Sequence, residues 1–363
     1  MSESMVPASL GAATREWFSQ VLASAHPGVQ VETLELERVI HGTATKAKFH
    51  LSYNDAGKRA GLPPVMWLKS PFEAHTEVIA KMGIYLAEGR FYRDLRPRLP
   101  VNAPRTFFTG LDEARGVAVV LMEDFEARGA TLGYATRPAS VDQVASTLEE
   151  LARMHAHWWR SRELDRVFPP PPARNPGEAS PFDRYREPEV IEQLLEGARA
   201  DGVPRHLRDP AAMSRAVKVW QEMQAERICF MHGDSHYGNV FYDPDGASGH
   251  YDWQNYHCGH WCHDVSYFMG TALRVRDRER SERDLVQHYV DCLRAGGVDE
   301  ISFDAAWLTY RQFLIYGLWI FLANWEEMQP FEVNATYVTR FAAAVSDHDT
   351  YGLLAKARET AEA

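Results

Sequence analysis

Three polar side chains near the middle of the chain have types and spacing suited to phosphoryl transfer. They are Asp234, Asn239 five residues later, and Asp252 thirteen residues after that. Transfer of a γ-phosphoryl group needs little covalent help, so catalysis rests on aligning the acceptor oxygen and neutralising charge on the phosphates. A carboxylate can orient the acceptor hydroxyl, while amide and carboxylate oxygens can hold Mg²⁺ on ATP. We therefore predict Asp234 as catalytic base and Asn239 and Asp252 as metal ligands.

The residues around Asp234 decide between this interpretation and a simpler one. An Asp and an Asn in a polar loop can merely form turns and helix caps, and for that pair alone the simpler interpretation is favoured. However, His232 lies two residues before Asp234, where it suits a buried hydrogen-bonding role that shapes the turn. The same intervals occur in the protein-kinase catalytic loop and its metal-binding Asp-Phe-Gly element. With the complete set in register, the catalytic interpretation is favoured.

The stretch His-Gly-Asp-Ser-His-Tyr-Gly-Asn at 232–239, followed by Asp-Trp-Gln at 252–254, resembles a known family signature. It is similar to that of the aminoglycoside phosphotransferase and choline kinase superfamily, in particular its ecdysteroid kinase-like branch. The resemblance extends from about residue 30 to the C-terminal helices. It implies an α+β, bilobal protein kinase-like fold with a β-rich N-terminal lobe and a mostly helical C-terminal lobe. It also implies a kinase that uses ATP and Mg²⁺ and phosphorylates a hydroxyl group of a small molecule.

Composition restricts the other classes of protein. The chain has 363 residues, 45% of them hydrophobic and 25% charged, which is typical of a globular protein with room for two lobes. The formal charge of -11 argues against nucleic acid or an anionic membrane as the main partner. The N-terminus lacks the features of a secretory signal, and the longest uncharged stretch, 312–325, is too short and interrupted to span a bilayer. We expect a cytoplasmic protein.

The first lobe is predicted from periodicity. Residues 9–24 follow an amphipathic helical pattern, and residues 29–53 alternate in the manner of a β-hairpin. We expect residues 54–57, Asn-Asp-Ala-Gly, to supply a turn after the hairpin.

The turn inside this hairpin lies where a kinase covers the nucleotide phosphates. It contains one glycine, Gly42, so the general glycine-rich signature is absent and the assignment depends on the resemblance. Backbone amides near Gly42 and the hydroxyls of Thr43 and Thr45 are the groups that could face phosphate oxygens.

Lys69 ends the short apolar stretch that begins at Val65. A lysine that closes a buried strand can simply extend to solvent, and its surroundings in the sequence alone favour that interpretation. Glu88, however, opens a Glu-x-x-Phe-Tyr element that the family also has. The resemblance implies an ion pair between Lys69 and Glu88 that directs the ammonium group at the α- and β-phosphates.

Residues 117–122 form a second apolar stretch, which leads into Glu123. The resemblance places the hinge between lobes here, with backbone groups of about Glu123 at the adenine edge. A strand end followed by a turn is the alternative, and residue types do not exclude it. We accordingly expect a nucleotide-binding lobe at 1–124 and a helical lobe with the catalytic loop and substrate-binding helices at 125–363.

The second lobe is predicted to be helical. Ser140 and Gln143 make a plausible capping box at the start of a long helix, in which His155 falls on the apolar face and is expected to be packed in the core. The resemblance implies that Asp264 hydrogen-bonds the backbone of the catalytic loop in a structural role. The proline-rich run at 168–188 cannot continue a helix. It is either a wall of the substrate site or a surface loop.

Cysteine and histidine cluster at 257–263, which raises the question of a zinc site. The spacing departs from the usual Cys-x2-Cys pairs and no second ligand cluster completes a closed site. We favour a loop that leads out of the Asp252 element, and reduced thiols for all four cysteines.

The helix expected at 303–325 carries too many aromatic side chains to face one direction, and kinases of this superfamily build the acceptor pocket from these helices. If some line the pocket, the acceptor is apolar, such as a sterol or terpenoid alcohol. An aminoglycoside would need many carboxylates, whereas a choline-like cation could use cation–π contacts. A macrolide acceptor also stays open, as does a non-catalytic nucleotide-binding pseudokinase. The sequence does not define the oligomeric state.

Overall fold

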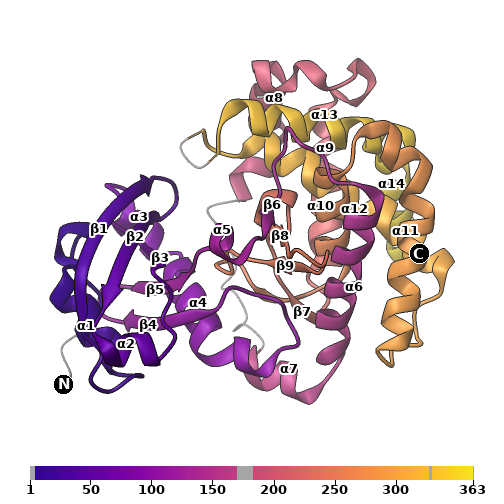
Figure 1. The fold of residues 1–363 in the computed structure, drawn as a ribbon. Helices are drawn as coiled ribbons and strands as arrows, with labels where there is room; N and C mark the ends of the chain where they lie inside the picture. Colours follow the sequence, from indigo (N-terminus) through magenta and orange to yellow (C-terminus); the bar gives the residue numbers. More distant parts are fainter. Residues whose placement is uncertain (1–4, 170–182, 327–328, 363) are drawn as a thin grey trace. The chain divides into compact units, whose positions relative to one another are not determined.

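The structure is a computed structural model that describes residues 5–169, 183–326 and 329–362. It contains two compact units, which the ribbon in Figure 1 shows as a sheet-rich N-terminal part and a helical C-terminal part. The first unit comprises Met1–Thr131, Asp243–Asp245 and His250–Asn255. The second comprises Leu132–Tyr242, Gly246–Gly249 and Tyr256–Ala363. Compactness does not define where a hinge bends, so the lobe boundary at residue 124 stays a prediction.

The first unit is built on a five-stranded antiparallel sheet in the order β1-β2-β3-β5-β4. The predicted hairpin is confirmed, because its two halves are neighbouring strands of this sheet. The strands are β1 (Val31–Ile40), β2 (Thr45–Tyr53), β3 (Val65–Ser70), β4 (Thr106–Asp112) and β5 (Val117–Glu123).

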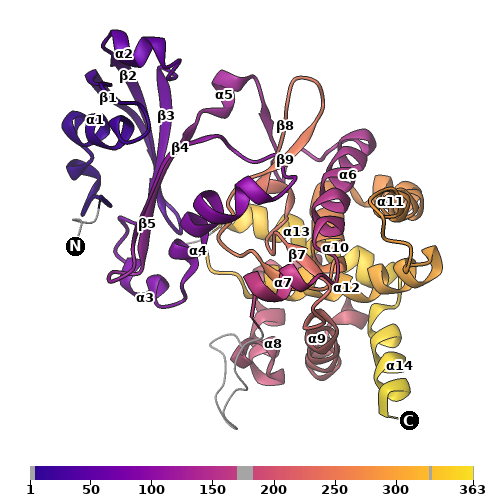
Figure 2. The ribbon, with the colours of Figure 1, turned by 90° about the horizontal axis from the view of Figure 1, so that it is seen from below.

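Alternation along the strands gives the sheet two different faces. On one face, Ala47, Phe49 and Leu68 are buried together with Phe18 and Leu22 of helix α1 (Arg15–Ala23). Helix α4 (Ile84–Arg90) lies on the opposite face, as Figure 2 shows. The two faces therefore separate the hydrophobic core under α1 from the polar residues discussed below.

Short helical segments complete the first unit. Residues 54–57 do not form a free turn, because Asn54 caps a short helix through a bond from the Gly57 amide. The expected turn was therefore wrong: the Asn side chain starts a helix. These segments are η1 (Leu10–Ala12), α2 (Asp55–Arg59), α3 (Thr76–Ala80), the π-helical η2 (Phe91–Leu95), η3 (Arg96–Arg98) and α5 (Phe125–Arg128).

The second unit is mainly helical. Helix α6 (Val141–His157) begins with the predicted capping box of Ser140 and Gln143. The other helices are α7 (Arg162–Val167), η4 (Asp183–Arg186), α8 (Pro188–Glu196), η5 (Ala198–Gly202), η6 (Arg205–Leu207), α9 (Pro210–Gln224), η7 (Tyr237–Asn239), α10 (Cys262–Ala272), α11 (Val275–Ala295), α12 (Phe303–Ala323), α13 (Phe331–Asp347) and α14 (Thr350–Glu362).

Helix α12 is the central element of this unit, and it packs against α9, α10, α11, α13 and α14. Most of its side chains from Tyr310 to Leu322 are buried, and a helix segment that is covered by protein on most sides is apolar on most sides. This burial accounts for many of its aromatic residues. The small strands are β6 (Thr131–Leu132), β7 (Cys229–Met231), β8 (Val240–Tyr242), β9 (Ser248–His250) and β10 (His257–Gly259).

The predicted α+β fold class is confirmed, with a β-sheet N-terminal region and a helical C-terminal region. Among the helices within the described ranges, none is long and apolar enough to cross a membrane. The proline-rich run lies largely at 170–182, outside the described residues.

Candidate active site

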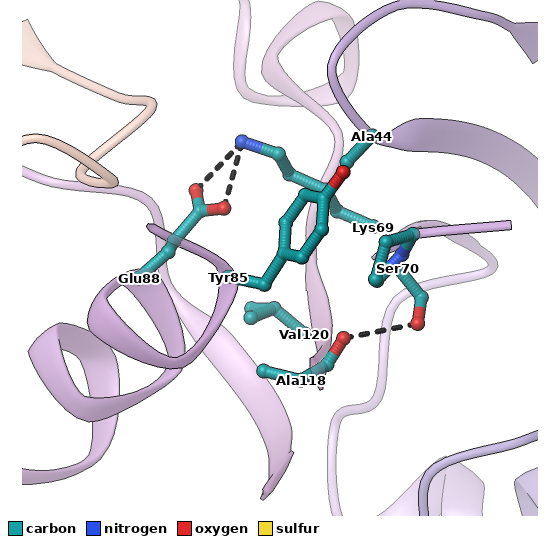
Figure 3. A pocket seen from close by; sticks show the side chains of 8 residues that line it. Ala44, Lys69, Ser70, Tyr85, Glu88, Ala118 and Val120 are labelled. Atoms are coloured by element: carbon teal, nitrogen blue, oxygen red, sulfur yellow. Dashed lines mark hydrogen bonds and ion pairs between the residues drawn. The ribbon is translucent and has the colours of Figure 1, made fainter. Parts of the chain in front are cut away.

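The predicted ion pair between Lys69 and Glu88 is present in the first unit. Lys69 Nζ lies 2.9 Å from Glu88 Oε1 and 2.7 Å from Oε2, and both side chains are buried. Figure 3 shows the ammonium group pointing toward the carboxylate across the space between β3 and α4. Lys69 does not extend to solvent, so the interpretation from the strand alone was wrong and the resemblance was the better guide.

A glycine lets α4 approach the sheet closely enough for this pair to form. At Gly89, a Cβ atom would lie 2.3 Å from Leu111 Cδ2 and 2.8 Å from Ala118 Cβ. Any side chain would therefore push the helix away from β4 and β5. Glu88 reaches Lys69 because its neighbour has no side chain.

Asp252 also contacts Lys69. Its Oδ1 lies 2.8 Å from Lys69 Nζ, and its Oδ2 lies 3.5 Å from Nζ of Lys46 on β2. Burial alone would lower the pKa of Lys69, but the charges and hydrogen bonds of Asp252 and Glu88 outweigh it and raise that pKa. Lys69 is therefore a fixed cation at neutral pH.

The backbone at Asp252 adopts an uncommon conformation, with φ of 64° in the left-handed region. Such a conformation costs about 1 kcal/mol or more in a residue other than glycine, and it persists only where the surroundings impose it. The next residue, Trp253, is fully buried and stacks on Phe91 with 4.0 Å between ring centroids. Phe91 directly follows α4, so this stack fixes Asp252 beside the end of the helix that carries Glu88.

In the second unit, a buried carboxylate shapes the loop that carries Asp234. Asp264 Oδ2 accepts the amide of His232 at 2.8 Å, and Oδ1 accepts the amide of Gly233 at 2.9 Å. His155 Nε2 lies 3.2 Å from the same carboxylate. The structural role implied for Asp264 is thus confirmed, and His155 is a core residue as expected.

Asp234 and Asn239 are held close together by backbone contacts of this loop. His232 is fully buried, and its Nδ1 accepts the Asp234 amide at 3.2 Å, which confirms that it shapes the turn. The Asn239 side-chain nitrogen donates to the Asp234 carbonyl at 2.8 Å. Because the nitrogen is committed in this way, the amide oxygen is the atom with which Asn239 can bind a metal.

His236 adds a polar group beside Asp234 that we did not assign from the sequence. Its Nδ1 accepts the Gly238 amide at 3.0 Å, so in the neutral ring the proton resides on Nε2. That Nε2 lies 3.9 Å from Asp234 Oδ1.

Aromatic side chains surround this part of the second unit. Tyr267 contacts His236 edge to face, stacks on Phe321 and packs against Tyr316. Burial, and to a smaller degree the charge of Asp234, raises the pKa of Tyr267 and of Tyr316. Both phenols therefore stay neutral. Asp234 has aromatic rather than acidic surroundings.

The predicted phosphate-covering residues Gly42, Thr43 and Thr45 lie in and just after the turn between β1 and β2. A Cβ atom at Gly42 would meet nothing within 4 Å, so packing within the protein does not require a glycine there. The Thr45 hydroxyl is buried and donates to Glu73 Oε1 at 2.6 Å. That hydroxyl is engaged within the protein, which the sequence did not indicate.

Glu123 ends β5, as predicted for the hinge, but its carboxylate is used internally. Oε1 accepts the Arg105 amide and an Arg128 guanidinium nitrogen, each at 2.8 Å. The next residue, Asp124, accepts from Trp67 Nε1 at 3.0 Å and pairs with Lys48 at 3.1 Å. These contacts engage the side chains of the predicted hinge, and the Glu123 amide itself donates to the Arg105 carbonyl at 3.0 Å.

The Cys/His cluster is not a loop, contrary to our expectation. Residues His257–Gly259 form β10, which pairs with β7, and Cys262 and His263 begin α10. In the part of the chain that the structure describes, no group of three or more His, Cys, Asp or Glu side chains is placed to hold a metal ion.

Sequence comparison defines the class of protein. Residues 82–297 match the model of the phosphotransferase enzyme family. The match covers more than half of the chain and includes the loop with Asp234 and Asn239. The chain belongs to this family and is a small-molecule phosphotransferase with a hydroxyl group as acceptor. No curated protein matches the sequence.

Comparison with solved structures supports the fold. An AMP-bound spectinomycin phosphotransferase has a TM-score of 0.50 at 12% identity, over 90% of this chain and 97% of that one. An ethanolamine kinase from Plasmodium vivax has a TM-score of 0.49 at 13% identity, over 86% and 82%. The choline kinase LicA from Streptococcus pneumoniae has a TM-score of 0.46 at 13% identity, over 92% and 98%. Identities of 12–13% support a likeness of fold alone, and of these three structures only the first reaches a TM-score of 0.50.

Proposed function

We propose that this phosphotransferase uses ATP and Mg²⁺ to phosphorylate a hydroxyl group of a small lipophilic molecule. Asp234 is the catalytic base, Asn239 and Asp252 bind the metal, and Lys69 with Glu88 positions the phosphates. The observation that carries the proposal is the loop held by Asp264, which fixes Asp234 and Asn239 relative to each other.

The proposed role of Asp234 follows from its chemistry and its support. Its carboxylate accepts a hydrogen bond from the acceptor hydroxyl and aligns that oxygen for attack. It takes the hydroxyl proton as the new oxygen–phosphorus bond forms and the bond from the γ-phosphorus to ADP breaks, so that ADP leaves. His232 and Asp264 limit the movement of the loop, so little reorganisation is needed before transfer. Mg²⁺, when bound, supplies positive charge that offsets the charge on the transferred group.

The donor set fits a hard cation. Mg²⁺ prefers oxygen ligands, commonly one or two carboxylates completed by phosphates and water. Asp252 supplies carboxylate oxygens, and the orientation of the Asn239 amide leaves its oxygen for the metal. Lys69 then meets the α- and β-phosphates, and the turn at Gly42 and Thr43 contributes backbone amides.

A lipophilic acceptor is proposed from the surroundings of Asp234. Tyr267, Tyr316 and Phe321 lie near it, while Glu326 is an exposed carboxylate that pairs with Arg199 at 3.6 Å. Aromatic surroundings favour a sterol or terpenoid-like alcohol, consistent with the ecdysteroid kinase-like branch. A polycationic aminoglycoside would require more acidic groups. A choline-like cation is the alternative that aromatic side chains near Asp234 also favour.

The test measures ADP formation against sterols, terpenoid alcohols, amino alcohols and antibiotics, with ATP and Mg²⁺. Asp234→Asn keeps the shape of the side chain and should preserve ATP affinity while lowering kcat by a factor of about 100 to 10,000. Asp284→Asn, on the exposed face of α11, serves as the matched control. Near wild-type turnover by Asp234→Asn would refute the assignment. Nucleotide binding without turnover on any acceptor would favour the pseudokinase alternative.

A further inference from the structure

The turn between β1 and β2 is hydrogen-bonded to two other segments of the first unit. A turn that covers phosphates is usually glycine-rich and mobile, but this one has a single glycine and is followed by buried Ala44 and Thr45. Two side chains from elsewhere in the unit, Glu73 and Tyr85, hydrogen-bond to it. No role was assigned to either from the sequence.

Glu73 lies in the segment between β3 and α3 and bridges both ends of the turn. Its Oε1 accepts the Thr45 hydroxyl at 2.6 Å and lies 3.0 Å from His41 Nδ1. Partial burial opposes ionisation, but the bonds from Thr45 and His41 outweigh it and lower the pKa of Glu73. At neutral pH the bridging group is therefore a carboxylate, and hydrogen bonds to a charged acceptor are the stronger kind.

Tyr85 holds the turn from α4, one helical turn before Glu88. Its hydroxyl donates to the Thr43 carbonyl at 2.7 Å, and burial raises the pKa of Tyr85 to about 12, so the donor proton is retained. Figure 3 shows the ring extending with its hydroxyl end toward Ala44. It borders a small hollow, open in part to solvent, whose lining also includes Lys69 and Glu88.

These contacts join the turn to the helix that positions Lys69. Tyr85 lies on α4 three residues before Glu88, the partner of Lys69, and its hydroxyl holds the carbonyl of Thr43. Glu73 holds Thr45, which follows the turn. The amides of the turn therefore have a set distance from the ammonium group of Lys69. A binding loop that is already ordered loses less conformational entropy when its ligand arrives.

We propose that Glu73 and Tyr85 are positioning residues that hold the β1–β2 turn ready for the nucleotide phosphates. The inference rests on the proposed function and refines it. Because the single hydroxyl proton of Thr45 is donated to Glu73, Thr45 acts through the turn, and the phosphate contacts come from the backbone amides near Gly42 and Thr43.

A double-mutant cycle separates this arrangement from direct contact between Thr45 and phosphate. The variants are Glu73→Ala, Thr45→Val and the double variant, with Glu113→Gln, from an exposed ion pair with Arg90, as control. ATP affinity is measured by calorimetry with Mg²⁺. Amide hydrogen exchange of residues 40–46 is measured without nucleotide, so this readout does not depend on activity.

Each single substitution should weaken ATP binding about tenfold and speed exchange in the turn. The double variant should weaken binding no further than Glu73→Ala, because Glu73→Ala already removes the bond to Thr45 together with the contact to His41. Glu73→Gln, which keeps an oxygen acceptor for Thr45, should restore most of the affinity. Tyr85→Phe should weaken ATP binding severalfold and speed exchange in the turn, because the bond to the Thr43 carbonyl is lost. If the two effects multiplied to about a hundredfold, Thr45 would contact the nucleotide independently of Glu73, and the proposal would fail.

The proposal also fails if exchange and affinity match the wild type in Glu73→Ala and Tyr85→Phe. A different result would refute the proposed function, namely near wild-type turnover by Asp234→Asn. The two sets of results can therefore be told apart.

Discussion

Replacing Asp264 by Asn is the most direct perturbation of the proposed catalytic loop that leaves Asp234 itself unchanged. Asp264 is fully buried and receives the amides of His232 and Gly233 and the imidazole of His155. Asparagine has nearly the same shape but no charge, one acceptor oxygen and a donor nitrogen. One of the two backbone amides must then face a donor.

The loss of stability in Asp264→Asn can be worked out from these bonds. A hydrogen bond to a charged acceptor contributes about 1.5–3 kcal/mol and a neutral one about 1 kcal/mol, while an unsatisfied buried amide costs about 1–3 kcal/mol. Relief of the buried charge offsets part of this loss. We expect the free energy of unfolding to fall by about 2–4 kcal/mol, because the unsatisfied amide adds to the weakened bonds. We also expect kcat to fall more than tenfold in the folded protein, because the loop is no longer fixed.

The assay is urea unfolding at pH 7 beside ADP formation at a temperature where the variant is folded, with Asp284→Asn as the surface control. A loss of less than about 0.5 kcal/mol, the range of ordinary surface substitutions, would refute the reasoning. So would unchanged kcat, since the loop would then hold its shape without the carboxylate.

The difference in the free energy of unfolding between the wild type and Asp264→Asn should also depend on pH. Burial opposes ionisation, but the hydrogen bond and charge of His155, with smaller contributions from His263 and His232, hold the pKa of Asp264 well below its usual range. A carboxylate with a depressed folded-state pKa stabilises the protein above its unfolded pKa, and this contribution is lost as pH falls toward the folded value. The stability gap should therefore be full at pH 6–7 and should narrow as pH falls below about 4.

Two further predictions concern metal binding and acid stability. Asp252→Ala removes the carboxylate beside Lys69, so the enhancement of ATP affinity by Mg²⁺ should fall at least several-fold in calorimetry; an enhancement as large as that of the wild type would contradict its role as ligand. Burial lowers the pKa of His263 from 6.5 to about 4. As pH falls below 6.5, this histidine therefore takes up a proton in the unfolded chain before it does so in the folded protein. His263 alone should lower the free energy of unfolding by about 2 kcal/mol at pH 5. His263→Gln, whose amide can still donate to the Gly233 carbonyl, should flatten this part of the stability curve; an unchanged slope between pH 6.5 and 5 would show that His263 does not titrate as described.

Local pattern was enough to predict most of the elements that carry the site. Alternation identified the β1–β2 hairpin, and the spacing of Ser140 and Gln143 identified the start of α6. The place of His232 two residues before Asp234 correctly indicated a buried side chain that shapes the turn. In each case the cause lies within a few residues of sequence, so the sequence contains it.

Contacts between distant segments were beyond this kind of inference. The bond between Thr45 and Glu73 joins residues 28 positions apart, and the pair between Lys46 and Asp252 joins residues 206 positions apart. The burial of Lys69 could not be predicted from its strand alone, because it depends on how closely α4 approaches the sheet at Gly89. Period-two alternation could have placed Lys46 on the same face as Lys69, had the register of β2 and β3 been known.

Each half of the proposed machinery is held by contacts internal to its own unit. Lys69 is fixed by Glu88 and Asp252 within the first unit, while the loop with Asp234 is fixed by Asp264 within the second. Each of these bonds joins residues of a single unit, so we expect a substitution in one network to leave the bonds of the other network in place. In the proposed mechanism, phosphoryl transfer nevertheless needs both halves at once, because Lys69 and Asp252 belong to one unit and Asp234 and Asn239 to the other. Stability effects should thus add across the two networks, whereas damage to either network alone should be able to abolish turnover.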